Sequence, residues 1–131
     1  MAGELAGRFN KDRRPLPGMS LSADAGTVTC ISNDFGYDAL YERQIDAFAH
    51  RGDIALALTT SGKSKNVIRG LNAAKAKGAV TIALTGRNGL SGAEADHLLA
   101  VPSDVTAHIQ EIHLMLLHFW CVQIDKAFAG G

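Results

Sequence analysis

The sequence predicts an α/β fold in which helices flank a parallel β-sheet. Short apolar runs alternate with longer segments whose apolar residues recur at helical spacing, and this order is typical of βαβ units. The apolar runs are nearly continuous, as expected for strands that are covered on both faces. Several of the 14 glycines lie where an expected strand turns into a helix.

The beginning of the chain is the least regular part. Residues 1–9 contain helix formers, and a charged run with prolines over 10–18 interrupts them. A helix that begins at Met1 has no N-cap residue, so we interpret this segment as the end of a longer helix. A short strand is expected over 19–23, whereas the pattern over 25–31 is ambiguous.

A turn and then a helix are expected next. Residues 33–37, with the sequence NDFGY, combine residue types that favour turns. The helix then begins at Tyr37 or Asp38 and ends near His50. Its apolar side consists of Leu40, Ile45, Phe48 and Ala49.

The rest of the chain shows the pattern of strands and helices most clearly. The expected strands are residues 53–58, 79–84 and 96–101, and the expected helices are residues 64–77 and 109–128. Gly78 provides the stop for the first of these helices. The order predicts βαβ units, a parallel sheet and helices on both of its faces. Together these elements predict a single domain over residues 1–131.

Length and charge limit the class of protein. The chain has 131 residues, of which 47% are hydrophobic, so it is long enough for one domain with a buried core. Its 13 basic and 13 acidic residues give a formal net charge of zero. A general nucleic-acid binder usually carries a basic excess, so this balance argues against that class.

The same inspection gives an expected location. No apolar run reaches the roughly 18 residues of a membrane span, and the chain does not open with a signal segment. Cys30 and Cys121 have no metal-type spacing, and two cysteines do not make a disulfide framework. We therefore expect a reduced, cytoplasmic protein without membrane or nucleic-acid partners.

The end of the first central strand carries the most chemistry. Thr59, Thr60, Ser61 and Ser64 place hydroxyl groups around Gly62, directly before a helix. Unpaired N–H groups and the helix dipole favour anions at such a point, so these neutral donors suit a phosphate monoester. The spacing is not that of a Walker loop. The alternative is that Ser61 or Ser64 only caps the helix.

The order of these motifs resembles the sugar isomerase (SIS) domain family. A strand that ends in TTSGKS, a helix, and a strand that ends in LTG form the general pattern. More specific segments resemble the phosphoheptose isomerases: SNDFGY over 32–37, TTSGKSKNVIRGL over 59–71 and VPSDVTAHIQEIHLMLLH over 101–118. The opening AGELAGRF over 2–9 and the RRPLPG run after it are also similar, so the resemblance covers essentially the whole chain in order.

The same resemblance implies that the family's first segments are missing here. Members of the family begin with a helical segment, a strand and a GNGGSA-type loop that leads into a helix carrying a histidine. Met1 would follow directly on the position of that histidine. We therefore expect an N-terminally truncated, SIS-type parallel-sheet sandwich with flanking helices and an unpaired sheet edge.

The resemblance implies an isomerase of bacterial heptose and lipopolysaccharide biosynthesis. Phosphoheptose isomerases convert D-sedoheptulose 7-phosphate into D-glycero-D-manno-heptose 7-phosphate by moving a proton between C1 and C2 through an enediol. Such a reaction needs a base and an acid. Glu4 is implied as the base and His118 as the partner acid or base. The family is homotetrameric, and the apolar helix over 109–128 suits a subunit interface.

The resemblance also implies a zinc ion in each subunit and a set of substrate ligands. Zinc would be held by Glu4, Gln110 and His118 together with the missing histidine. The implied substrate-binding residues are Glu4, Asn33, Asp34, Thr59, Thr60, Ser61, Ser64 and Gln110. Gln110 and His118 lie about 12 Å apart along a helix, so one metal requires side chains that lean together or a site shared between subunits.

Simpler interpretations stay open for these residues. A frayed, solvated chain end would also contain an acidic residue such as Glu4. His118 has apolar neighbours, which is also typical of a core histidine, and Asn33–Asp34 fits an ordinary turn. The alternative function is a noncatalytic SIS module that binds a sugar phosphate or a protein partner without turnover or metal.

Overall fold

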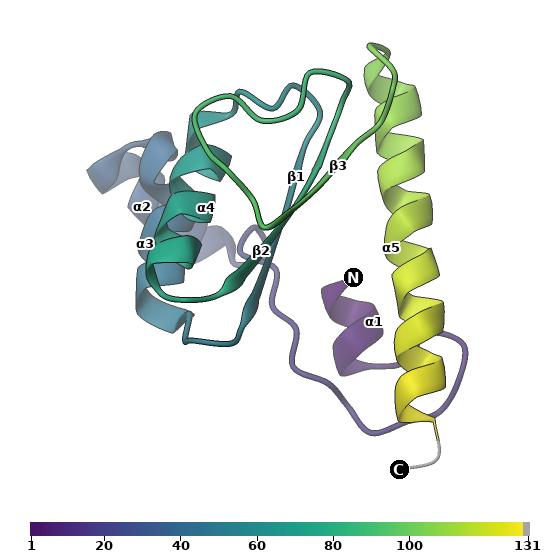
Figure 1. Cartoon of the computed structure of the whole chain (residues 1–131). Coiled ribbons are helices and arrows are strands. Elements are labelled where there is room, and N and C mark those ends of the chain that lie inside the picture. The colour runs from purple at the N-terminus through teal and green to yellow at the C-terminus, as the bar shows by residue number, and fades with distance from the viewer. Residues whose placement is uncertain (130–131) are drawn as a thin grey trace. The chain divides into compact units, whose positions relative to one another are not determined.

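The computed structural model describes residues 1–129 and has an α/β architecture (Figure 1). Its elements, in chain order, are α1 (Ala2–Ala6), α2 (Ala25–Phe35), the 3₁₀ helix η1 (Tyr37–Ala39), α3 (Leu40–Phe48), β1 (Ile54–Thr59), α4 (Lys65–Ala76), β2 (Val80–Thr85), β3 (His97–Ala100) and α5 (Thr106–Phe128). They form two compact units. We call residues 21–110 the central unit, and residues 1–20 with 111–129 the terminal unit.

The central unit contains a parallel three-stranded sheet in the order β1-β2-β3. Ile54 pairs with Val80 at one end of the β1–β2 ladder, and Thr59 pairs with Thr85 at the other. Thr85 also pairs with Ala100 of β3, so all three strands end at the same edge of the sheet. β1 and β3 are the edge strands of this sheet.

Helix α4 packs directly on the sheet of the central unit, and helix α3 packs on α4. α4 contacts both β1 and β2, and α3 packs against α4 (Figure 1). The two helices approach closely at Gly70, where a Cβ atom would lie 2.9 Å from the Cβ of Tyr41. The buried residues of these helices and of β2 include Leu40, Leu71, Ala74, Ala83 and Leu84, which are all at most 2% exposed.

The strand expected over 19–23 is wrong, because this segment forms no strand and α2 begins directly after it. The side-chain amide of Gln44 donates to the carbonyl of Leu21 at 2.9 Å. Asp24 then caps α2 by accepting hydrogen bonds from the N–H groups of Gly26 and Thr27. The ambiguous segment 25–31 is therefore helical.

The turn expected over 33–37 is wrong in its first half. Asn33, Asp34 and Phe35 continue α2 to its end. Gly36 then ends the helix with φ of +83°, a left-handed conformation that suits glycine, and η1 follows. The turn-forming residues were correctly recognised, but the reversal of the chain begins at Gly36.

The terminal unit consists of α1, the loop that follows it and most of α5. The loop returns to α1, because the N–H of Leu16 donates to the carbonyl of Leu5 at 2.9 Å. A Cβ atom on Gly18 would lie 2.9 Å from the side chain of Leu5, which shows how closely the loop covers α1. None of the helices in residues 1–129 combines the length and the apolar character that a bilayer crossing requires.

Candidate active site

The loop after β1 has the hydroxyl-rich geometry that the sequence predicted. Thr59 is 5% exposed, and its Oγ1 accepts a hydrogen bond from the N–H of Gly62 at 3.2 Å. The hydroxyl groups of Thr59 and Ser64 are also 3.2 Å apart. These contacts hold the loop against the end of β1, so the Thr59 side chain stabilises the conformation of the loop.

The structure contradicts the interpretation that Ser61 or Ser64 only caps α4. Ser64 occupies the N-cap position, yet its side chain accepts no capping hydrogen bond. Ser61 accepts a hydrogen bond from the N–H of Lys63 at 3.2 Å, which lies before the helix. Within the described residues, the N–H groups of Lys65 and Asn66 have no acceptor. The start of α4 therefore keeps donors free for an anion.

Gly62 fixes the course of the loop through a close backbone contact. It has φ of +66°, and a Cβ atom at this position would lie 1.7 Å from the carbonyl oxygen of Gly89. The N–H of Ser91 donates to the Gly62 carbonyl at 2.9 Å, and the N–H of Gly86 donates to the Thr60 carbonyl at 3.1 Å. The loop after β2 thus supports the hydroxyl-bearing loop from its side.

Asn33 and Asp34 lie in the last turn of α2 in the central unit. Both residues are exposed. The amide of Asn33 donates to Oδ1 of Asp34 at 3.1 Å, and Oδ2 of Asp34 lies 3.8 Å from the Cys30 sulfur. An open hollow on the same helix is lined by Thr29, Cys30, Ser32 and Asn33. The two predicted sugar-binding residues are therefore accessible and lie side by side.

Glu4 and His118 both belong to the terminal unit. Glu4 is half-buried and lies in the first turn of α1, so the expectation of a frayed end is wrong for this residue. His118 is exposed on α5, and its ring stacks on Phe9 with ring centroids 5.3 Å apart. His118 is therefore not a core histidine. Within residues 1–129, neither side chain has a hydrogen-bond or ion-pair partner, so both are chemically uncommitted.

Cys121 follows His118 by one turn of α5 and contacts the beginning of the chain. Its sulfur lies 3.5 Å from the Met1 sulfur. Burial raises the pKa of the Cys121 thiol, and the nearby charges of Glu4 and Asp125 add to that rise. The Cys121 thiol therefore stays protonated at neutral pH.

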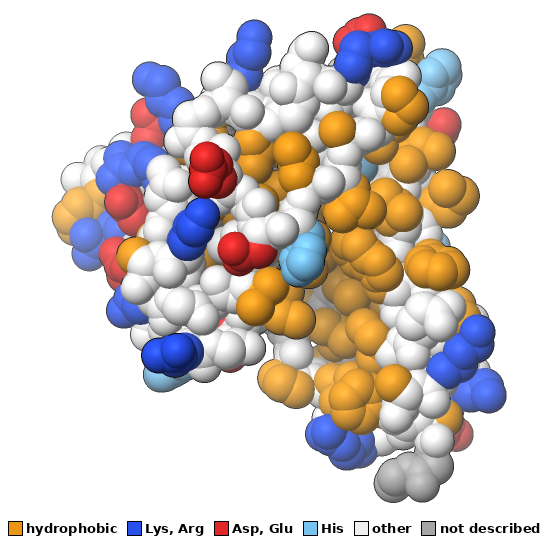
Figure 2. All heavy atoms as spheres, viewed as in Figure 1, with side chains coloured by type: hydrophobic (Ala, Val, Ile, Leu, Met, Phe, Trp, Pro, Cys, Tyr) orange, Lys and Arg blue, Asp and Glu red, His pale blue; other side chains and the backbone are white. Residues whose placement is uncertain are grey.

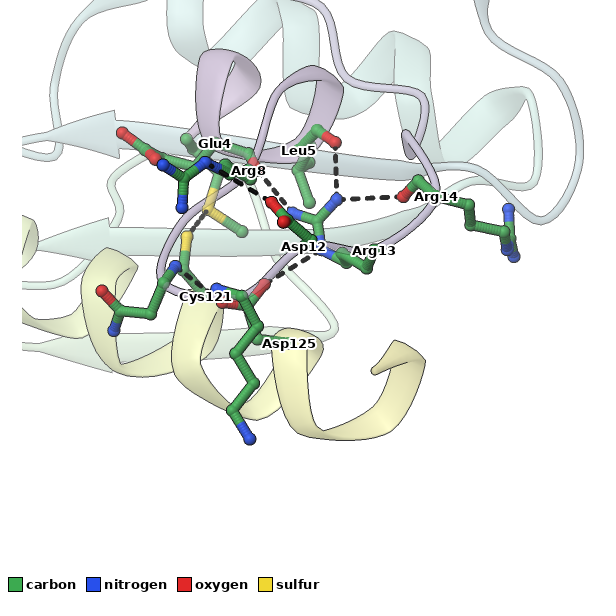
Figure 3. A network of polar contacts seen from close by, with 11 residues as sticks. Glu4, Leu5, Arg8, Asp12, Arg13, Arg14, Cys121 and Asp125 are labelled. Atoms are coloured by element: carbon green, nitrogen blue, oxygen red, sulfur yellow. Dashed lines mark hydrogen bonds and ion pairs between the residues drawn. The ribbon is translucent and has the colours of Figure 1, made fainter. Parts of the chain in front are cut away.

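A buried ion pair in the terminal unit was missed by the sequence analysis. Arg13 and Asp125 have side chains only 1% and 3% exposed, and Nε of Arg13 lies 3.0 Å from Oδ1 of Asp125 (Figure 3). Burial raises the pKa of Asp125, but hydrogen bonds from the N–H groups of Asn10 and Lys11 and from Arg13 hold it below its ordinary value. One available signal was the acidic Asp125 in the mostly apolar segment 114–128.

Gln110 lies near the beginning of α5, in the part of that helix that belongs to the central unit, and is exposed. The predicted zinc ligands therefore divide between the two units. Among residues 1–129, no group of three His, Cys, Asp or Glu side chains is close enough to hold a metal ion.

Comparisons with known proteins identify the family. The SIS domain model matches residues 1–86. The chain is 47% identical to a phosphoheptose isomerase of Aquifex aeolicus over 96% of this chain and 66% of that protein, and 46% identical to a probable phosphoheptose isomerase of Thermoplasma acidophilum over 95% and 69%.

Solved structures agree with the sequence relatives. The phosphoheptose isomerase of Francisella tularensis superposes with a TM-score of 0.86 at 35% identity, over 95% of this chain and 68% of that one. The enzyme of Neisseria gonorrhoeae gives a TM-score of 0.84 at 37% identity, over 95% and 67%. The chain thus spans about two thirds of the length of its relatives. It belongs to the phosphoheptose isomerase family of SIS-domain enzymes.

Proposed function

We propose that this protein isomerises D-sedoheptulose 7-phosphate to D-glycero-D-manno-heptose 7-phosphate in bacterial heptose and lipopolysaccharide biosynthesis. The observation that carries the proposal is the loop between β1 and α4. Its Ser64 hydroxyl does not cap the helix, and the N–H groups of Lys65 and Asn66 lack acceptors among the described residues. Such a set of neutral donors binds a phosphate without a cation cluster. The phosphoheptose isomerase relatives supply the substrate class.

We assign the proton transfer to Glu4 and His118. Glu4 removes a proton from C1 of the ketose while His118 protonates the carbonyl oxygen at C2, which gives a 1,2-enediol. Glu4 then delivers its proton to C2, and His118 takes the hydroxyl proton from O1, so that the carbonyl forms at C1. Within the described residues both side chains lack hydrogen-bond and ion-pair partners, so both are available to a substrate. Asn33 and Asp34 are proposed to bind the sugar hydroxyl groups.

We also propose that zinc takes part, held by Glu4, His118 and Gln110. Carboxylate oxygen, imidazole nitrogen and amide oxygen are donor types that fit this ion. Only Glu4 and His118 are strong donors, and the described residues form no cluster of three His, Cys, Asp or Glu side chains, so the set needs a further ligand. When bound, zinc would polarise the substrate oxygen on which negative charge develops.

A homo-oligomer, and specifically a tetramer, is proposed for the active state. The support is the exposed apolar surface of α5, to which Leu114, Met115 and Phe119 contribute with 54%, 58% and 57% exposure (Figure 2). Exposed apolar patches that exceed those of ordinary monomers mark protein–protein interfaces. We place the reaction in the cytoplasm, since Cys30 and Cys121 are both free thiols.

A noncatalytic SIS module is the second candidate, and it is favoured by the loop between β1 and α4, whose donors need neither Glu4 nor His118 to bind a phosphate. The deciding experiment measures heptose 7-phosphate formation from sedoheptulose 7-phosphate, with and without added zinc, for the folded chain and for Glu4→Gln. Zinc-dependent turnover that the substitution abolishes supports the isomerase. Sugar-phosphate binding without turnover from a folded sample supports the binding module instead.

A further inference from the structure

Helix α1 carries Glu4 and ends at Ala6, two residues later. The N–H of Gly7, which caps this end, donates to the carbonyl of Gly3, and the carbonyls that follow Gly3 have no further partner within the helix. Contacts made to these carbonyls therefore help to fix the direction in which the Glu4 carboxylate points.

Arg13 supplies contacts of this kind at the C-terminal end of α1. Its Nη1 donates to the carbonyl of Leu5 at 3.0 Å, and its Nη2 donates to the carbonyl of Glu4 itself (Figure 3). Carbonyl groups at the end of a helix lack partners within the helix and carry partial negative charge. A guanidinium group suits this position because its planar fork donates several hydrogen bonds at fixed angles.

The other side of the same guanidinium group is held by α5. Nε of Arg13 bonds to Oδ1 of Asp125 at 3.0 Å. Oδ2 of Asp125 accepts from the N–H groups of Asn10 and Lys11 at 2.8 and 3.0 Å. Asp125 thus fixes both Arg13 and the backbone of the loop that precedes it. Because the pair is almost fully buried, water does not compete for these bonds.

The loop that Asp125 holds also reaches the second proposed acid–base residue. Phe9, which stacks on His118, directly precedes Asn10. One buried pair therefore ties together the helix that carries Glu4, the loop that contacts His118 and the helix on which His118 lies. Neither Arg13 nor Asp125 has a place in the proposed proton transfer itself.

We propose that Arg13, held by Asp125, is a positioning residue that fixes α1 and thereby aims the Glu4 carboxylate at the substrate. This inference rests on the proposed function for its catalytic part. Its structural part, the fixation of α1, is measurable whether or not the chain turns over substrate. Misplacement of a catalytic group by about 1 Å can cost on the order of 100-fold in rate, so a small rotation of α1 would be detectable.

The test compares Arg13→Lys with the neighbouring Arg14→Lys. Lysine at position 13 keeps a positive charge beside Asp125, which preserves folding, but it lacks the planar fork that reaches both carbonyls. Arg14 is the matched control, because its guanidinium group lies over the Phe128 ring at 5.0 Å and donates no bond to α1. Arg13→Met serves as a second variant that removes every donor.

Two measurements are made on each variant. Hydrogen exchange is followed at the amides of Leu5 and Gly7, which donate within α1 to Met1 and Gly3, and at amides of α4 as a reference for the other unit. For Arg13→Lys we expect exchange at Leu5 and Gly7 to accelerate about tenfold, with α4 unchanged. For the same variant we expect kcat per folded molecule to fall about tenfold or more. KM should stay within about twofold, because the substitution leaves the loop between β1 and α4 unchanged.

The possible outcomes separate the two claims. Unchanged exchange at Leu5 and Gly7 in both Arg13 variants overturns the inference, whatever the activity. Faster exchange in α1 with unchanged kcat shows that Arg13 holds α1 without serving the reaction, and this also overturns it. Absence of turnover in the unsubstituted chain refutes the proposed function instead, and the exchange data then still decide whether Arg13 fixes α1.

Discussion

Substitution of Gly62 by alanine should disrupt the phosphate loop more severely than its small size suggests. The new Cβ would lie 1.7 Å from the Gly89 carbonyl oxygen, whereas ordinary contact begins at 3.4 Å. The backbone around Gly89 would therefore have to move by about 1.7 Å, the difference between those two distances. No flexible side chain is available to absorb this shift, because the clashing atom belongs to the backbone.

The magnitude follows from two contributions. A non-glycine residue in the left-handed region costs about 1–2 kcal/mol. Movement of the Gly89 loop also endangers the hydrogen bond from Ser91 N–H to the Gly62 carbonyl, worth about 1 kcal/mol. We expect Gly62→Ala to reduce the free energy of unfolding by about 2–3 kcal/mol and to weaken phosphate binding.

Gly52→Ala is the matched control for this prediction. Gly52 has φ of +91°, but a Cβ atom there would meet nothing within 4 Å, so the substitution introduces backbone strain without a clash. Urea unfolding gives the stability of both variants, and calorimetric titration with sedoheptulose 7-phosphate gives their affinity. Equal destabilisation and equal affinity in the two variants would refute the reasoning, because the contact with Gly89 would then have no consequence.

Three further predictions concern single side chains. Ser64→Ala should weaken binding of the sugar phosphate with little loss in the free energy of unfolding, because the Ser64 hydroxyl does not cap α4. Asp24→Ala should lower the free energy of unfolding and leave sugar-phosphate binding unchanged, because Asp24 caps α2. Calorimetric titration measures the binding, and urea unfolding measures the stability. Glu4→Gln should lower kcat by about 10²- to 10⁴-fold without weakening phosphate binding, as steady-state kinetics would show. Hydrogen bonds from the backbone N–H and the hydroxyl of Thr81 lower the pKa of Asp96 below its ordinary value of 3.8. The Asp96 carboxylate therefore stabilises the fold above pH 3.8, and this stabilisation is lost as the pH falls through the pKa of Asp96 in the folded state. Urea unfolding at a series of acid pH values should show that Thr81→Val loses less stability on acidification than the unsubstituted chain. An unchanged pH dependence of stability in that variant would contradict the role of the Thr81 hydroxyl in lowering the pKa of Asp96.

The sequence was most informative where local pattern and tertiary structure agree. The apolar runs before Thr59 and Thr85 became the parallel strands β1 and β2, and the glycine stop at Gly78 correctly marked the end of the α4 segment. The hydroxyl-rich loop was also predictable, because its residues are contiguous in the sequence and directly precede the start of a helix, which favours anion binding. These features depend on neighbours in the chain.

Helix α2 was not predictable because its stability comes from outside its own composition. Gly26, Val28 and Thr29 are poor helix formers, so the pattern over this segment favoured no structure. The cap at Asp24 and the adjacent packing of α3 outweigh that propensity. A capping aspartate before an ambiguous segment was the available signal for a helix.

The support of the candidate site was hidden from sequence reasoning for a different reason. The contact between Gly62 and Gly89, and the pair formed by Arg13 and Asp125, join residues that are far apart in the chain. No periodicity or motif links such positions. Their partners become evident only when the fold brings the segments together.

The measurement that most directly tests the central claim is the conversion of sedoheptulose 7-phosphate by this chain in D₂O, followed by NMR. The account predicts formation of D-glycero-D-manno-heptose 7-phosphate, whose hydrogen at C2 is the proton that Glu4 removed from C1 or a deuteron that replaced it on Glu4. A folded chain that forms no heptose 7-phosphate would contradict the account.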